Sequence, residues 1–225
     1  MSKRGRLIVI DGSDGSGKAT QTKLLVQQLK KKGVRVRTLD FPQYESNFFG
    51  AFIGRCITGK HGDFLTLDPY ITSVLYAADR FESSIQIKAW LDAGDTVVLD
   101  RYVSANQIHQ GGKIPEPHKR KEFLIWLDKM EYDSFRLPRP HLVIYLDVPF
   151  AMSMRLLAQS QQKKKYLEEG DVDLVEQNES YLRNARNSAL WLARHQKGWH
   201  RIQCATEVDQ LRTVEDIHEE VMSLI

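Results

Sequence analysis

The sequence has few cysteines and no long apolar run, and these absences exclude several classes of protein. Only two of its 225 residues are cysteine, Cys56 and Cys204, and they lie too far apart in the sequence for a zinc or redox motif. No segment approaches the roughly 18 consecutive apolar residues of a membrane-spanning helix. The apolar run Leu7 to Ile10 is too short for a secretory signal. We therefore expect a cytoplasmic protein that does not bind membranes.

Charge is also nearly balanced. The 32 Lys and Arg residues exceed the 29 Asp and Glu residues by only three, although the sequence pI is near 8.8. Nucleic-acid binding needs a clustered positive face, which so small an excess does not indicate. The 42% apolar and 27% charged fractions are typical of a globular chain. Since no flexible linker interrupts the sequence, we predict one domain over residues 1–225.

The order of apolar segments indicates an α/β fold. The continuous run Leu7-Ile8-Val9-Ile10 is typical of a strand buried on both faces of a parallel sheet. Further strands are predicted at 34–39, 96–99, 142–146 and 199–204, and helices at 18–32, 69–93, 117–130, 149–162, 174–197 and 214–225. Alternating strands and helices predict a mostly parallel sheet with helices on both faces, a three-layer αβα arrangement.

A glycine-rich segment directly after the first strand carries the strongest chemical signal. Gly12-Ser13-Asp14-Gly15-Ser16-Gly17-Lys18 matches the spacing G-x-x-x-x-G-K, and a predicted helix follows it. Glycines let backbone N–H groups curl around a phosphate, the helix N-terminus adds positive charge, and the lysine reaches the terminal phosphates. We therefore predict an ATP phosphate site formed by residues 12–20, named Gly12, Ser13, Asp14, Gly15, Ser16, Gly17, Lys18, Ala19 and Thr20.

Magnesium cannot be held in the usual way in this loop. The motif normally continues with Ser or Thr, whose hydroxyl binds Mg²⁺, but Ala19 follows Lys18 here. Thr20 points about 100° further round the helix and does not simply replace it. We therefore expect the triphosphate, water and nearby carboxylates to hold Mg²⁺, with Asp11, Asp14 and Asp100 as candidates.

Two strand ends supply an acid near this loop. Asp100 follows Val97-Val98-Leu99, and Asp147 follows Leu142 to Leu146. Ligands of open α/β sheets bind beyond the carboxyl ends of the strands, so both acids are candidates. We favour Asp100, because the adjacent Arg101 supplies a cation for a phosphate.

At this point the chain resembles the thymidylate kinases, which transfer the γ-phosphate of ATP to dTMP. The resemblance rests on motifs that cover residues 7 to about 110. They are the phosphate loop with Asp11 before it, Phe41-Pro42-Gln43-Tyr44, His61-Gly62-Asp63-Phe64, Tyr76-Ala77-Ala78-Asp79-Arg80, and Asp100-Arg101-Tyr102-Val103-Ser104-Ala105-Asn106-Gln107.

The resemblance implies how the acceptor nucleotide binds. Tyr76 would stack on thymine, and Arg80, four residues later on the same helix face, would donate to a thymine carbonyl. Arg101 would hold the acceptor phosphate. The full set of implied substrate-side residues is Asp14, Phe41, Tyr44, Tyr76, Arg80, Arg101, Ser104, Asn106, Gln107, Asp173 and Glu176. For Asp173 and Glu176 an ordinary role at a helix N-terminus stays open, and His109 either lines the pocket or only packs.

The polar segment 159–173 resembles the lid of these kinases. Family members with a neutral phosphate loop usually place a catalytic arginine in the lid, whereas this segment carries Lys163, Lys164 and Lys165. We expect one or more of these lysines, or Arg155 upstream, to join Lys18 and Arg101 in stabilising the transferred phosphoryl group. The resemblance further implies a homodimer.

Other functions share parts of this pattern. A different nucleoside monophosphate kinase or a deoxynucleoside kinase would have the same fold and differ in the pocket. A non-catalytic nucleotide-binding protein is suggested only by Ala19. A regulatory GTPase is disfavoured, because the sequence has no Asn-Lys-x-Asp for reading guanine.

Overall fold

The described part of the computed structural model is built around a parallel β-sheet. Residues 4–159, 167, 173–206 and 210–225 are described. Within them the sheet has five strands in the order β2-β3-β1-β4-β5. The strands are β1 (Leu7–Gly12), β2 (Val36–Asp40), β3 (Thr96–Asp100), β4 (Leu142–Asp147) and β5 (Trp199–Gln203). Every neighbouring pair is parallel, which confirms the predicted sheet.

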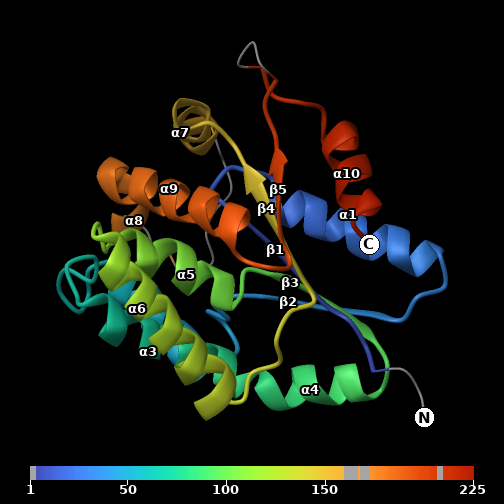
Figure 1. Ribbon diagram of the computed structural model, residues 1–225, viewed down its shortest axis with the longest axis horizontal. Helices are drawn as coiled ribbons and strands as arrows, with labels where there is room; N and C mark the ends of the chain where they lie inside the picture. Colours follow the sequence, from blue (N-terminus) through green and yellow to red (C-terminus); the bar gives the residue numbers. More distant parts are fainter. Residues whose placement is uncertain (1–3, 160–166, 168–172, 207–209) are drawn as a thin grey trace.

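Helices cover both faces of the sheet (Figure 1). They are α1 (Lys18–Lys31), α2 (Phe48–Ile57), α3 (Pro69–Glu82), α4 (Ser84–Asp92), α5 (Val103–Gly112), α6 (Pro117–Asp128), the π-helix η1 (Lys129–Ser134), α7 (Phe150–Gln159), α8 (Leu174–Gln177), α9 (Glu179–His195) and α10 (Val214–Ser223).

Alternate residues of the strands face opposite sides of the sheet and pack in two separate cores. The sheet is therefore the middle layer between two layers of helices. Leu7 and Val9 of β1 pack in the core beneath α5, α6 and α9. Ile8 and Ile10 face the other core, beneath α1 and α10. A strand buried on both sides needs apolar residues at every position, so the continuous run in β1 is explained.

Two predicted helices are each divided in the structure. The predicted helix 69–93 is α3 and α4, which meet at Ser83, a residue with φ −84° and ψ −6°. Because these angles are still close to helical, the apolar spacing continues through the break and conceals it. The predicted helix 174–197 is α8 and α9, separated at Asn178, whose side chain caps α9 by accepting from Tyr181 N at 3.0 Å.

Helices α2 and α5 were not predicted from the sequence. Each contains two glycines, which lower helix propensity. In α5 the glycines allow close packing: a Cβ at Gly112 would lie 3.0 Å from backbone atoms of Ala185 in α9. Tertiary packing of α5 on α9 therefore outweighs local propensity.

Candidate active site

The glycine-rich segment forms a loop between β1 and α1. Gly15 and Gly17 have φ values of 77° and 85°, a region that favours glycine. The loop is closed by Ser16 N donating to Ser13 O at 3.1 Å, and the Lys18 ammonium donates to the same carbonyl at 2.8 Å. Lys18 thus folds back over the loop. The N-terminus of α1 and the Lys18 cation therefore meet at one glycine-rich loop, and together they suit a phosphate.

Helix α7 rests directly on this loop. Ser153 Oγ donates to Asp14 O at 2.8 Å and lies 3.2 Å from Ser13 Oγ. A Cβ built on Gly15 would approach the Leu156 Cβ to 3.1 Å. The loop is therefore supported on one side by α7.

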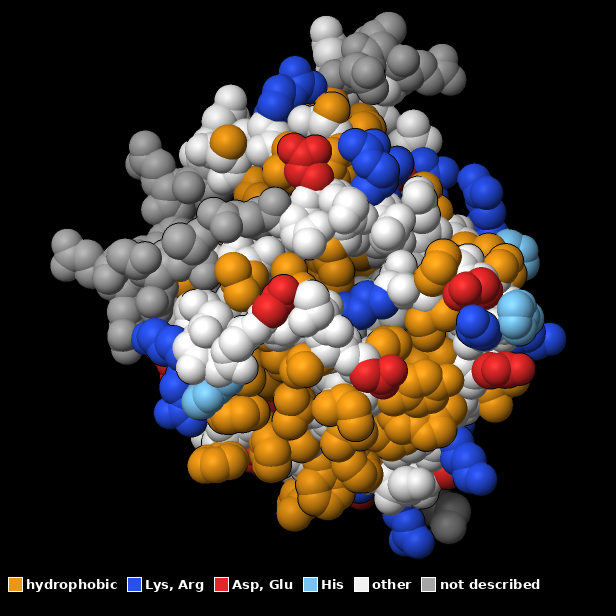
Figure 2. Space-filling model, turned by 90° about the vertical axis from the view of Figure 1, so that its left-hand side faces the viewer, with side chains coloured by type: hydrophobic (Ala, Val, Ile, Leu, Met, Phe, Trp, Pro, Cys, Tyr) orange, Lys and Arg blue, Asp and Glu red, His pale blue; other side chains and the backbone are white. Residues whose placement is uncertain are grey.

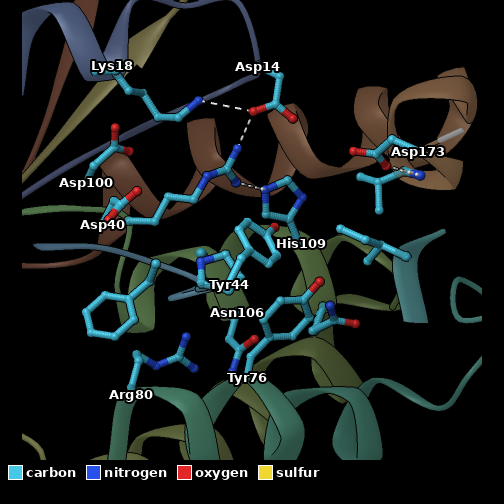
Figure 3. A pocket seen from close by; sticks show the side chains of 18 of the residues that line it. Asp14, Lys18, Asp40, Tyr44, Tyr76, Arg80, Asp100, Asn106, His109 and Asp173 are labelled. Atoms are coloured by element: carbon cyan, nitrogen blue, oxygen red, sulfur yellow. Dashed lines mark hydrogen bonds and ion pairs between the residues drawn. The ribbon is translucent and has the colours of Figure 1, made fainter. Parts of the chain in front are cut away.

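A cavity of about 450 Å³ runs from the phosphate loop to helix α3 (Figure 3). Eleven of the predicted site residues line it. These are Asp14, Lys18, Ala19, Phe41, Tyr44, Tyr76, Arg80, Asp100, Arg101, Asn106 and Asp173, joined by residues that include Asp40, His109, Gln110 and Tyr181. Tyr76 and Arg80 lie on one face of α3, as their spacing predicts. The cavity therefore has a phosphate end and an aromatic end.

Arg101 stands between these two ends. Its φ of 64° is unusual for a residue with a side chain and turns the chain sharply after β3. One guanidinium nitrogen, Nη2, donates to Asp14 Oδ1, and the other, Nη1, lies 3.0 Å from His109 Nε2. Lys18 Nζ lies 3.3 Å from the same Asp14 oxygen. Two cations thus converge on one carboxylate beside the phosphate loop.

His109 is part of the cavity wall, so the pocket role left open by the sequence is the one its position favours. The ring stacks on Tyr181 at 5.7 Å between centroids, with the planes 16° apart. Burial, aided by the nearby Arg101 charge, lowers the His109 pKa from 6.5 to about 3. The imidazole is therefore neutral and accepts a hydrogen bond from Arg101.

The aromatic end contains a buried ionic network that sequence reasoning missed. Arg80 donates to Glu131 through Nε at 2.8 Å and Nη2 at 2.6 Å, and both side chains are almost fully buried. Asn106 Nδ2 donates to Glu131 Oε1 at 2.9 Å and to Ser73 O at 3.1 Å. Glu131 lies in η1, outside every motif found in the sequence, so no local pattern predicts its role.

Asp11 and Ser104 hold the loop and α5 together. Asp11 is fully buried. Its Oδ1 accepts from Gly12 N at 2.8 Å, and its Oδ2 accepts from Ser104 Oγ at 2.6 Å. Ser104 and Gln107, both predicted to contact substrate, are not among the residues lining the cavity in the described chain. Both oxygens of Asp11 are already engaged by the protein.

A comparison with known families shows which family the chain belongs to. A family model described as thymidylate kinase matches residues 10–217, which is most of the chain. The chain belongs to the thymidylate kinase family. The resemblance noted in the sequence is therefore confirmed.

Relatives carry the same family name. The thymidylate kinase of Mycobacterium tuberculosis (strain ATCC 25618 / H37Rv) is 32% identical over a match covering 63% of this chain and 65% of that protein. This match spans slightly less than two thirds of that relative. The thymidylate kinase of Schizosaccharomyces pombe is 30% identical over 100% of this chain and 94% of its own length. That of Plasmodium falciparum is 29% identical over 98% and 89%.

A solved structure from the same family has the same fold. The structure of thymidylate kinase from Candida albicans aligns with a TM-score of 0.75 and 21% identity, covering 100% of this chain and 92% of that chain. At this identity the likeness concerns the fold alone. It confirms the predicted α/β P-loop fold.

Among the predicted magnesium carboxylates, Asp100 has the most suitable position. It lines the cavity, whereas Asp11 is enclosed and Asp14 faces Arg101 and Lys18. Burial raises the Asp100 pKa, although Lys18 and Arg101 act in the opposite direction. No group of three or more His, Cys, Asp or Glu side chains in the described residues could hold a metal. One carboxylate with phosphates and water is nonetheless a usual Mg²⁺ environment, so the residues fit the ion.

The remaining predicted residues differ in where they lie. Asp173 lines the cavity and caps α8, accepting from Val175 N at 2.8 Å and Glu176 N at 3.3 Å. Asp173 thus has the helix N-terminal role, and its contact with substrate stays a prediction. Arg155 is exposed on α7 and Thr20 is exposed on α1. Lys163, Lys164 and Lys165 lie outside the described residues.

Asp147, the strand-end acid that we did not favour, is occupied by two arginines. It is buried and pairs with Arg186 at 2.8 Å and with Arg201 at 2.6 Å. Its charge is therefore neutralised within the protein between α9 and β5.

Proposed function

We propose that the protein transfers the γ-phosphoryl group of ATP to dTMP and so forms dTDP for dTTP synthesis. The single observation that carries this proposal is the continuous cavity that joins Lys18 of the phosphate loop to Tyr76 and Arg80. Such a cavity can hold a phosphate donor and an aromatic acceptor nucleotide end to end. Membership of the thymidylate kinase family supports the same activity.

The chain's own residues position the two nucleotides. The loop N–H groups and Lys18 bind the donor phosphates, and Arg101 faces the acceptor phosphate from the opposite side. Tyr76 stacks on the base, and Arg80 donates to it. Phosphoryl transfer depends mainly on alignment and on stabilising charge, and the acceptor phosphate is already ionised, so no strong general base is needed.

The negative charge of the triphosphate also needs a metal ion, Mg²⁺. When bound, Mg²⁺ neutralises charge on the triphosphate. Asp100 is the residue that would hold it, through its carboxylate at the end of β3. A further cation is expected to close over the transferred phosphoryl group. Arg155 and the lysines 163–165 are the candidates.

The alternative functions differ in the acceptor, so a substrate panel distinguishes them. ATP consumption with Mg²⁺ is measured with dTMP, dUMP, dCMP, GMP, AMP and thymidine. We expect the highest kcat/KM with dTMP. Activity with thymidine alone would establish a nucleoside kinase instead, and no turnover at all would favour a binding protein. Lys18→Ala should abolish turnover, whereas the matched control Lys23→Ala, at an exposed position of α1, should not.

We also propose a homodimer, formed through the apolar surface of α3 and its neighbours. Figure 2 shows apolar side chains gathered on the side of the molecule that carries α3. Phe48, Ile71, Val74, Phe81 and Ile85 are large apolar residues with exposed fractions between 40% and 79%. Exposed apolar patches of this kind mark association surfaces. In a symmetric dimer the same patch of a second copy would pack against this one.

Light scattering tests the dimer directly. The wild-type protein should have twice the mass of one chain, and Ile71→Lys should be monomeric. The matched control Lys30→Glu changes an exposed charge on α1 and should stay dimeric. A monomeric wild-type protein would refute the dimer without affecting the proposed activity.

The cellular location also belongs to the proposal. Cys56 and Cys204 are both free and buried, which suits a reducing cytoplasm. Within the described residues, none of the helices is both long enough and apolar enough to cross a membrane.

A further inference from the structure

Glu131 occupies a special place at the aromatic end of the cavity. Its carboxylate is fully buried and receives three hydrogen bonds from two side chains that line the cavity. These two side chains, Arg80 and Asn106, come from different helices, α3 and α5. One anion therefore controls the orientation of two residues that face the acceptor base.

The ion pair with Glu131 first determines which guanidinium nitrogen of Arg80 is available to a ligand. Arg80 uses Nε and Nη2, one edge of its planar guanidinium, to bind both oxygens of Glu131. This is the bidentate geometry in which an arginine is most firmly oriented. The remaining terminal nitrogen, Nη1, lies at the other edge and is a donor only. Since Arg80 lines the cavity, it presents N–H groups to a ligand.

The same carboxylate determines which way the Asn106 amide faces. Asn106 Nδ2 lies within hydrogen-bond distance of Glu131 Oε1 and of the Ser73 carbonyl oxygen. A carboxylate and a carbonyl only accept, so the amide NH₂ group has to face them. The amide oxygen of Asn106 is turned to the other side, toward Tyr76 (Figure 3). The cavity wall therefore offers a donor from Arg80 and an acceptor from Asn106.

We propose that Glu131 sets the base selectivity of the acceptor site, by fixing this donor and acceptor pattern. The pattern matches the 4-oxo and N3–H groups of a 2,4-dioxopyrimidine monophosphate. Cytosine reverses both groups, because it carries an amino donor at position 4 and an unprotonated N3. Glu131 is a positioning residue that acts through Arg80 and Asn106. The inference rests on the proposed phosphorylation of dTMP and adds the origin of its selectivity.

The isosteric substitution Glu131→Gln tests the inference. In either orientation the NH₂ of the new amide faces a nitrogen of Arg80, because Oε2 accepts from Nε and Oε1 accepts from Nη2. When the NH₂ takes the place of Oε1 it also faces Asn106 Nδ2, so the arginine pair is weakened and the asparagine amide can be reversed. We expect the KM for dTMP to rise and the dTMP to dCMP ratio of kcat/KM to fall by about tenfold or more, since hydrogen-bonded sites discriminate strongly. The KM for ATP should not change. A general loss of folded protein would lower all activities together and leave the ratio unchanged.

The matched control is Glu122→Gln, an exposed glutamate on α6. It should retain wild-type selectivity. If Glu131→Gln does not fold, Glu131→Asp keeps the charge but is one methylene shorter and cannot reach both partners. We expect the same fall in selectivity for this variant.

The outcomes separate this inference from the proposed function. A folded Glu131 variant that retains the wild-type dTMP to dCMP ratio overturns the role of Glu131 alone. A wild-type protein that does not phosphorylate dTMP overturns both. A lowered ratio with unchanged KM for ATP supports both.

Discussion

Nη1 of Arg101 lies 3.0 Å from Nε2 of His109. Because arginine nitrogens only donate, Nε2 accepts, and the proton of the neutral ring resides on Nδ1. The pKa of His109, lowered to about 3 by burial and by Arg101, keeps the ring in this form at neutral pH. His109 therefore holds the Arg101 guanidinium toward the cavity without adding charge.

Removing this acceptor should weaken the acceptor-phosphate site. His109→Phe retains a ring beside Tyr181 but leaves Nη1 of Arg101 without its partner. We expect kcat/KM for dTMP to fall by about tenfold, in line with the loss of one hydrogen bond to a charged group. His109→Gln offers an amide oxygen and should recover part of the activity. Steady-state kinetics with a matched His118→Phe control on the exposed face of α6 would measure this.

His109 should also make the protein less stable in mild acid. Its folded-state pKa of about 3 lies below the ordinary value of 6.5. As the pH falls below about 6.5, the unfolded chain takes up a proton that the folded chain does not, so the free energy of unfolding decreases. Urea unfolding at pH 7 and pH 5 should show a smaller decrease for His109→Gln than for the wild type. Equal decreases would contradict the buried neutral imidazole.

Ser104 should contribute to stability through Asp11. In Ser104→Ala the buried Asp11 Oδ2 loses the hydroxyl that donates to it at 2.6 Å. We expect the free energy of unfolding to fall by about 1–3 kcal/mol, the usual cost of an unsatisfied buried polar group. Chemical denaturation measures this, with Ser223→Ala at the exposed end of α10 as control. If Ser104 instead contacts substrate, KM for dTMP would change while stability would not.

Magnesium dependence should follow Asp100 and not Ala19. Asp100→Asn removes the carboxylate that faces the cavity, so the Mg²⁺ concentration for half-maximal activity should increase. Ala19→Ser restores the hydroxyl expected by the loop motif and should change that concentration by less than about twofold, because phosphates and water already complete the coordination. A large gain in Mg²⁺ affinity for Ala19→Ser would show that the ion sits against α1. Titration of activity with Mg²⁺ at fixed ATP distinguishes the two cases.

Local sequence patterns are enough to predict much of the fold and part of the site. The apolar run in β1, the glycine loop and the spacing of Tyr76 and Arg80 are each set by neighbouring residues, and the structure places them as expected. Glu131 could not be found this way, because it meets Arg80 across 51 residues of sequence. The π-helix that carries it has no sequence signal of its own.

Other differences have the same origin in long-range packing. Helix α5 contains Gly111 and Gly112, which oppose helix formation locally but permit its contact with α9. Ser104 matches a substrate-side motif, yet its hydroxyl is directed to Asp11. The motif identifies which residues gather near the loop, whereas the structure is needed to show which of them face the cavity. The single-domain organisation and the roles of residues 163–165 stay predictions.

The contact between α7 and the phosphate loop limits how this sequence could change. Any side chain at Gly15 would have to adopt a φ of 77° and would meet Leu156 and the Ser153 carbonyl oxygen at 3.1 to 3.4 Å. An arginine at Gly15 would therefore need both this strained backbone conformation and a small shift of α7 away from the loop. Substitutions in α7 and in the phosphate loop consequently have to be compatible with each other.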